Sequence, residues 1–421
     1  MSKFRQILRD PDFLLLWVGQ IISQIGDRLG QMALIAFVYA KAPGSSLEIA
    51  KILSFTIVPV FVIGPVAGVY VDRWDRRKTL YICDFLRAIM VLFVILFLFK
   101  VQNLGAAYLM IFILFCIGRF FVPAKLAIIP DLVDKKDLLM ANSLVNITGM
   151  IAAILGFGVS GLLVEWLKAQ GGLYLDSLSF FVSAALIFFI SKRACATQWC
   201  LRSVSNVSKE IVEVIKKSVL QEIKEGNLYL FQKRDITFSI VIIFILWSAL
   251  GAVYAVLIAF VQNTLHSVTK DLGLLLMFLG VGLFIGSLFY GRFGQRFSAY
   301  KIIFVSLIVS GIMLIVFAFT IQRYPYFLVA AGLSLLFGAV VAPIMIAANT
   351  IIHNVSDNGM MGKVFSSLEI VMHLGFLVFM FLSSLLAEKL SHSTILIFVG
   401  CLVILLGLVS LIVNRKIKWS G

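Results

Sequence analysis

Ionisable side chains lie within the long apolar runs of this chain, where each one needs a physical reason to be present. Asp27 lies in the stretch QIGDRLGQ, and Glu369 and His373 lie four residues apart in another apolar run, on one helix face. A carboxylate in apolar surroundings can take up a proton, and histidine titrates near neutral pH. We therefore predict Asp27, Glu369 and His373 as proton-binding candidates. The alternatives are a structural ion pair for Asp27 and a polar packing contact for the other two.

Two arginines in the apolar runs are candidates for substrate binding or charge pairing. Arg28 follows Asp27, but adjacent residues on a helix point about 100° apart, so the two need not pair with each other. Arg119 is the partner suggested for Asp27 if that acid is structural; it could also attract an anionic headgroup or extend to the interface. Asp84 and Arg87, three residues apart, favour an intrahelical ion pair.

The composition indicates which elements must carry these charges. Of the 421 residues, 61% are hydrophobic and 14% are charged, with a mean hydropathy of +1.05. A bilayer is crossed by helices of about 20 apolar residues, because unpaired backbone groups are not tolerated in lipid. We therefore predict an all-α integral membrane protein, with Glu165 and Asp176 near the outer ends of their spans and in contact with water. The sequence predicts twelve spans, near residues 12–40, 47–71, 79–100, 104–124, 138–167, 173–191, 235–262, 270–291, 299–321, 325–350, 361–387 and 393–414.

The connections between these spans predict orientation and domain organisation. Most lysines and arginines lie in alternate connections, which places both termini in the cytoplasm and accounts for the net charge of +15 without nucleic acid. The longest connection, residues 193–234, separates a six-helix bundle at 1–192 from a second at 235–421. Apolar residues recur at helical spacing within 211–223, which predicts an amphipathic helix on the cytoplasmic face. Two such halves enclose a site near the bilayer midplane in many transporters.

Several classes of function lack their motifs in this sequence. It contains no G-x-x-x-x-G-K-[ST] loop for nucleotides, no H-E-x-x-H zinc motif and no G-x-S-x-G nucleophile turn. We therefore predict no enzyme activity, no catalytic residue, no metal site and no cofactor. The five cysteines are expected to be reduced and structural.

The connection GVYVDRWDRRKTL, residues 68–80, resembles motif A of the major facilitator superfamily, G-x-L-a-D-r-x-G-r-k-x-x-l. Tyr70 and Asp75 replace the leucine and the second glycine of the pattern. The resemblance implies a major facilitator fold in which this acid and these arginines latch the two halves at a cytoplasmic gate. A weaker echo, GRFGQRFSAYK, begins with Gly291 where the acid would stand. The gate residues in register are Gly68, Asp72, Arg73, Arg76 and Arg77.

Further stretches resemble the drug-exporter branch that includes macrolide efflux proteins, to which siderophore exporters and lysophospholipid flippases are related. The resemblance implies a monomeric secondary transporter of the bacterial cytoplasmic (inner) membrane. It would export a hydrophobic or amphipathic small molecule, of drug or siderophore type, in exchange for protons by alternating access. The stretches are FFVPAKLAIIPDLVDKKDLLMANSL at 120–144, YLDSLSFFVSA at 174–184, EIKEGNLYL at 222–230 and MGKVFSSLEIV at 361–371.

Two alternatives remain open from the sequence. A lysophospholipid flippase of the same fold would use Arg28 and Arg119 to receive the lipid phosphate. A membrane sensor or scaffold that transports nothing would use residues 193–234 to hold its partners.

Overall fold

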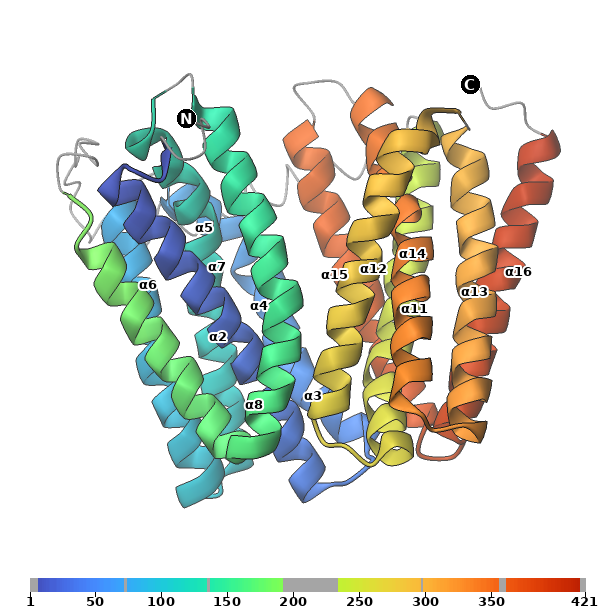
Figure 1. Cartoon of the computed structure of the whole chain (residues 1–421), viewed down its shortest axis with the longest axis horizontal. Coiled ribbons are helices and arrows are strands. Elements are labelled where there is room, and N and C mark those ends of the chain that lie inside the picture. The colour runs from blue at the N-terminus through green and yellow to red at the C-terminus, as the bar shows by residue number, and fades with distance from the viewer. Residues whose placement is uncertain are drawn as a thin grey trace. The chain divides into compact units, whose positions relative to one another are not determined.

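The computed structural model describes residues 7–71, 74–134, 137–191, 234–296, 298–355 and 361–416. Within these ranges the regular structure is helical and no strand is present, so the predicted all-α class is confirmed (Figure 1). Nine helices of the described residues are long and apolar enough to cross a membrane. The predicted count of twelve spans stays a prediction.

The chain divides into two compact units. The first contains Met1–Phe37 and Ile52–Gln221, and the second contains Val38–Lys51 and Glu222–Gly421. The predicted amphipathic helix at 211–223 lies outside the described residues. The helices up to residue 188 are α2 (Pro11–Lys41), α3 (Ser46–Ile57), α4 (Pro59–Val62), α5 (Gly64–Val71), α6 (Arg76–Ile95), the π-helix η1 (Leu96–Lys100), α7 (Leu104–Leu132) and α8 (Leu138–Phe188).

Two predicted spans differ in detail from the observed helices. The range 47–71 is divided into α3, α4 and α5, with breaks just before Pro59 and before Gly64-Pro65. Proline lacks a backbone N–H and disfavours helix at the residue before it, which explains both breaks. The ranges 138–167 and 173–191 are joined in α8, where Lys168 has φ 64° and ψ 173° and marks the turn between them.

The core of the first unit lies where α6 packs on α7 and α8. One cluster of buried side chains joins α2, α6, α7 and α8 through Phe13, Leu80, Ile128 and Ile187, each fully buried. Asp75 caps the start of α6 by accepting a hydrogen bond from the Lys78 backbone N–H at 3.0 Å. This cap fixes where α6 begins. It therefore also helps to position Asp84 and Arg87, which lie two to three turns further along the helix.

Between residues 234 and 416, the described part of the second unit has six long helices and one short 3-10 helix. The unit also includes Val38–Lys51. α12 packs on α14, α13 on α16 and α11 on α15. Glycines allow close approach, because a Cβ on Gly282, Gly286 or Gly338 would collide with backbone atoms of the facing helix in the α12–α14 pair. The elements are α11 (Arg234–Leu265), α12 (Lys270–Phe293), η5 (Gly294–Arg296), α13 (Ala299–Arg323), α14 (Phe327–Val355), α15 (Met361–Leu386) and α16 (His392–Lys416).

Candidate functional site

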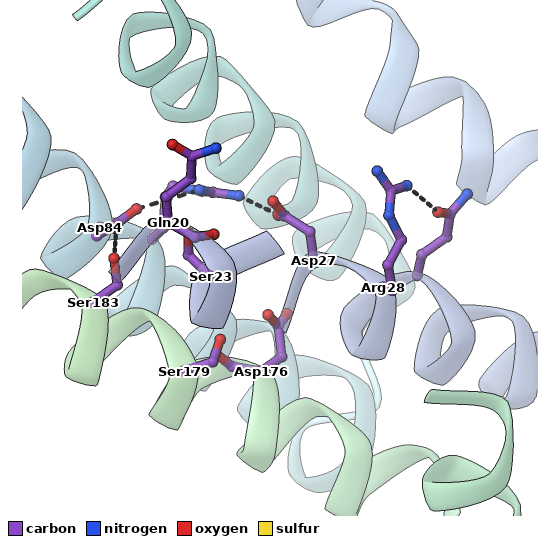
Figure 2. A network of polar contacts seen from close by, with 10 residues as sticks. Gln20, Ser23, Asp27, Arg28, Asp84, Asp176, Ser179 and Ser183 are labelled. Atoms are coloured by element: carbon purple, nitrogen blue, oxygen red, sulfur yellow. Dashed lines mark hydrogen bonds and ion pairs between the residues drawn. The ribbon is translucent and has the colours of Figure 1, made fainter. Parts of the chain in front are cut away.

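A cluster of polar side chains lies inside the first unit, where α2, α6 and α8 meet (Figure 2). Arg87 of α6 is at its centre and forms an ion pair with Asp27 of α2. Arg87 also pairs with Asp84 on its own helix, with 3.3 Å between Nη1 and Oδ1. The predicted intrahelical pair of Asp84 and Arg87 is therefore confirmed. One guanidinium thus joins acids from two helices.

The environment of the cluster is polar at the centre and apolar around it. Asp84 is fully buried, and its Oδ2 accepts a hydrogen bond from Ser183 Oγ of α8 at 2.5 Å. The Arg87 guanidinium lies over the ring of Phe180, 3.9 Å from its centroid, which adds a cation–π contact. Asp27 differs from Asp84 because 35% of its side chain is exposed. The cluster therefore has one buried acid and one accessible acid around the same cation.

A third acid, Asp176 of α8, belongs to this site. The expectation that it reaches water near the end of a span is wrong, because Asp176 is only 3% exposed. Its Oδ1 is buried and has no hydrogen-bond partner. A buried carboxylate oxygen without a partner is costly, so its presence here needs a functional explanation.

A small cavity of about 20 Å³ connects the three charged groups, with Asp27, Arg87 and Asp176 in its wall. Apolar side chains from the surrounding helices also line it, including Val91, Val94 and Ile111. That volume is enough for about one water molecule, which would find hydrogen-bonding partners here. The cavity therefore has room for about one water molecule beside these three charged groups.

The sequence of α2 explains how α8 can bring polar residues so close. A Cβ on Gly26 would collide with Ser179, and one on Gly30 would collide with the Asp176 carboxylate. Glycines four residues apart lie on one helix face and let a neighbouring helix approach. A side chain at either position would force Ser179 or the Asp176 carboxylate to move from its place in the cluster.

The two arginine candidates lie outside the ion pairs of this cluster. Arg28, labelled in Figure 2, donates from Nη1 to Gln31 Oε1 at 3.3 Å. Its guanidinium lies 4.7 Å from the centroid of the Phe157 ring. Arg119 is half-buried on α7, near Cys116. Asp27 forms a salt bridge with Arg87, and the suggested pairing of Asp27 with Arg119 stays a prediction.

Glu369 and His373 are on α15, in the other unit. His373 Nδ1 lies 2.8 Å from the backbone carbonyl oxygen of Glu369, so the contact between them involves the main chain and not the carboxylate. The His373 ring packs against Trp247 with 5.6 Å between centroids, while Glu369 is exposed. Their spacing on one helix face is as predicted, and their titration stays a prediction.

The motif A arginines hold neighbouring helices of the first unit. Arg76 Nη1 contacts Asp131 of α7 at 2.8 Å and the Ala127 carbonyl at 3.0 Å. Arg77 donates to the Phe188 carbonyl at the end of α8. Gly68 is on α5, whereas Asp72 and Arg73 lie outside the described residues. The predicted latch between halves stays a prediction.

Sequence reasoning missed Asp131, Asp176 and Ser183 as parts of these networks. Asp176, Ser179 and Ser183 follow one another at spacings of three and four residues. That spacing places them on one helix face, so a polar stripe was visible within an apolar run. No comparable signal marked Asp131, because its partner Arg76 is 55 residues away in the sequence.

Comparison with known proteins identifies relatives along nearly the whole chain. The model of a family of MFS transporters described as "Transmembrane secretion effector" matches residues 4–419. An uncharacterised MFS-type transporter, YfiS of Bacillus subtilis (strain 168), is 24% identical, over 96% of this chain and 93% of its own. Macrolide efflux protein A of Streptococcus pyogenes is 23% identical over 96% of each chain. The putative bacilysin exporter BacE of Bacillus amyloliquefaciens is 26% identical, over 96% and 95%.

Solved transporter structures share the fold. A bacterial homologue of the iron transporter ferroportin, in an inward-facing state, superposes with a TM-score of 0.72 at 17% identity. The aligned region covers 98% of this chain and 99% of that one. The nucleoside transporter NupG gives a TM-score of 0.72 at 14% identity, over 95% and 98%. At these identities the likeness establishes the fold alone.

Proposed function

The chain belongs to the "Transmembrane secretion effector" family of major facilitator transporters, and we propose that it exports a hydrophobic or amphipathic small molecule in exchange for protons. Similarity to a macrolide efflux protein and to a putative bacilysin exporter supports export of such a molecule. The proposed setting is the bacterial cytoplasmic membrane, with both termini in the cytoplasm. The observation that carries proton coupling is the shared ion pair of Arg87 with Asp27 and Asp84.

Charge in the cluster favours proton binding. Three carboxylates, Asp27, Asp84 and Asp176, surround Arg87, and Lys125 of α7 is a further cation that interacts with Asp27. If all three acids are ionised, negative charge exceeds positive charge even with both cations counted. Uncompensated charge inside an apolar bundle is expensive, so one proton on the cluster restores balance.

Asp27 is the acid best placed to exchange that proton. Its side chain is 35% exposed, whereas Asp84 is fully buried and Asp176 is nearly so. The mechanism follows from the shared guanidinium. When Asp27 takes a proton from the acidic outer side, its attraction for Arg87 falls, and Arg87 is free to turn to Asp84 and to the unpartnered Oδ1 of Asp176. Loss of the proton to the cytoplasm restores the Asp27 pair.

This exchange of partners provides a two-state element of the kind that alternating access needs. In one state the cation joins α2 to α6, and in the other it joins α6 more tightly to α8. A substrate that binds one state more tightly then changes the affinity for the proton. By linkage, the proton changes the affinity for the substrate by the same factor. Glu369 on α15 is the second acid that we propose for proton coupling, with His373 next to it.

The test uses the purified protein in proteoliposomes with a trapped pH dye and an imposed proton gradient. A panel of a macrolide, a lipophilic cation, a catecholate siderophore and a lysophospholipid is added to identify a compound that moves protons. We expect Asp27→Asn to fold and to abolish this movement, and Glu369→Gln to reduce it. Glu48→Gln is the matched control, because Glu48 belongs to the second unit and pairs with Lys51 on its own helix, α3. Wild-type proton movement in Asp27→Asn would remove that acid from the mechanism.

A lysophospholipid flippase is a second candidate, favoured by the surroundings of Arg28. Its described contacts are with a neutral amide and an aromatic ring, and its Nε is buried without a hydrogen-bond partner. A cation held in this way can receive a phosphate. Redistribution of a labelled lysolipid without proton movement, lost in Arg28→Gln, would favour this candidate over proton-coupled export.

A further inference from the structure

The second unit contains a partly open cavity that the proposed proton mechanism does not use. It has a volume of about 300 Å³ and lies among α11, α12, α13 and α14. Leucine is the commonest residue in its wall, which also contains Phe317 and Phe337. No Asp, Glu, Lys, Arg or His is among the described residues that line it. The cavity is therefore both large and uncharged.

Unfilled apolar space of this size, even partly open to the outside of the unit, is unusual in a helical bundle. Protein interiors are close-packed, with few voids larger than a water molecule, because unfilled space loses dispersion contacts. Apolar cavities stay dry and bind apolar molecules, and small-molecule sites begin at about 300 Å³. The α12–α14 pair is packed tightly through its glycines, so the space does not reflect loose association of the whole unit. The cavity thus has the size and chemistry of a ligand site.

One hydrogen-bond donor in the wall lacks a partner. Trp247 of α11 lines the cavity, and its indole Nε1 is buried without a hydrogen bond. The ring is held by His373 and Phe376 of α15, with centroids 5.6 Å and 6.1 Å away. Buried indole N–H groups usually have a partner. Protein atoms cover this one, so an acceptor on a ligand would satisfy it once the side chains over the nitrogen shift. The hydroxyl of Ser310, by contrast, already donates to the Leu307 carbonyl at 2.8 Å.

We propose that this cavity binds an uncharged, largely apolar molecule or chain that carries one hydrogen-bond acceptor for Trp247. A charged ligand is excluded because the wall provides no counter-ion to offset its loss of water. The same chemistry is present in a dissolved hydrophobic compound and in a lipid acyl chain with its ester carbonyl. Binding here does not depend on proton coupling, so it can be tested whether or not Asp27 titrates.

The experiment measures quenching of Trp247 fluorescence in lipid nanodiscs. The other five tryptophans are replaced by phenylalanine. Bromine quenches tryptophan on contact, so the probes are bromoundecanol, bromoundecane without the acceptor, bromoundecanoate with a charge, and a phospholipid brominated in its acyl chain. Val341→Phe of α14 fills the cavity. Val329→Phe is the matched control, because it makes the same change on the same helix at a side chain that is 38% exposed.

We expect saturable quenching by bromoundecanol that is weakened about tenfold by Val341→Phe and unchanged by Val329→Phe. The alkane and the carboxylate should bind more weakly than the alcohol. Quenching by the brominated phospholipid that Val341→Phe removes would identify an acyl chain as the occupant, and its absence would identify a dissolved solute. Either result supports the site.

Other results would overturn the proposal. Quenching that rises without saturation, or that is equal in the two valine variants, would show that the probes reach Trp247 only from the bilayer. Saturable binding of bromoundecanoate as tight as that of the alcohol would contradict an uncharged ligand. If Val341→Phe does not elute as a folded monodisperse protein, Ser334→Leu fills the same cavity and provides the same comparison.

Discussion

At the scale of single residues, the central fact is that one guanidinium serves acids on two helices. Arg87 is 9% exposed in its side chain, and its ion pairs with Asp27 and Asp84 lie within an apolar bundle. Buried ion pairs often add little net stability, but removing one partner leaves an uncompensated charge that costs several kcal/mol. The stability of the first unit should therefore depend more on Arg87 than on any of the acids.

We expect Arg87→Met to destabilise the protein by about 3–5 kcal/mol, because it leaves Asp84 buried and without a counter-ion. Adding Asp84→Asn to this variant should restore part of the loss, since the neutral amide keeps an acceptor for Ser183. Unfolding of the purified protein in detergent, followed by circular dichroism, measures both effects. An Arg87→Met variant as stable as the wild type would contradict the assignment of Arg87 as the centre of the cluster.

The sequence predicted the local part of this cluster and missed its long-range part. Asp84 and Arg87 are three residues apart, so helical spacing alone identified their pair. Asp176 was misplaced, because hydropathy locates a span but does not say how far a residue lies from its end. Which residue pairs with Asp27 depends on how α2 is rotated about its axis relative to α6. The spacing of apolar residues in the sequence does not specify that rotation. Glycines at 26 and 30 were the available signal for that rotation.

At the scale of helices, the contact of α2 with α8 depends on glycine. We expect Gly30→Ala to destabilise the first unit by about 1–3 kcal/mol, because the new methyl group would collide with the Asp176 carboxylate and displace α8. Transport should fall as well, since the three acids would no longer meet. Thermal unfolding and the proton assay measure the two effects.

Gly332→Ala on α14 is the control for this substitution. A Cβ at Gly332 would meet nothing within 4 Å, so only the helix preference of alanine should act, stabilising by about 0.5–1 kcal/mol. Equal changes in stability from the two substitutions would show that α2 and α8 rearrange to accept the methyl group. The close approach of the two helices would then not be needed.

A second helix-scale contact joins the start of α6 to the end of α7. Arg76 and Asp131 are partly exposed, at 24% and 22% of their side chains, so their pair should contribute only about 0.5–1 kcal/mol. A double-mutant cycle of Arg76→Ala and Asp131→Ala, followed by unfolding at low and high salt, measures this coupling. A coupling free energy near zero at low salt would show that Arg76 has another role, such as the latch between the two halves.

The sequence predicted helix positions well and helix interruptions poorly. Long apolar runs identified α11, α12 and α13 within a few residues, whereas the predicted range 104–124 ended well before α7 does, at Leu132. The break of the 47–71 range follows from Pro59 and Pro65, which the length rule ignores. The turn at Lys168 requires a positive φ, a conformation that lysine rarely adopts, so composition offered no warning of it.

At the scale of the whole molecule, the two units hold different chemistry. The first contains the charged cluster around Arg87, and the second contains the uncharged cavity beside Trp247. An exporter that exchanges protons for a hydrophobic molecule needs both kinds of site. Placing them in separate units lets each keep the dielectric surroundings that it requires, because charge in the apolar cavity would weaken binding there.

The orientation of the chain in the membrane is predicted from the connections rich in lysine and arginine. We expect residues in those connections to be cytoplasmic and the turns at Val101 and Ser391 to be external. After the five native cysteines are replaced, single cysteines are introduced and intact cells are treated with a membrane-impermeant maleimide. Val101→Cys and Ser391→Cys, both exposed, should react at once. Asp134→Cys and Ser298→Cys, also exposed, should react only after lysis.

The four positions are chosen so that each unit has one on each side. A reversed pattern in both units would invert the proposed direction of proton flow through Asp27, because the acidic compartment would then face the other end of α2. A reversed pattern in only one unit would contradict the even number of crossings expected before the second unit. The expected pattern leaves Arg76 and Asp131 at the cytoplasmic end of their helices, where the arginine satisfies the charge rule and also holds α6 to α7.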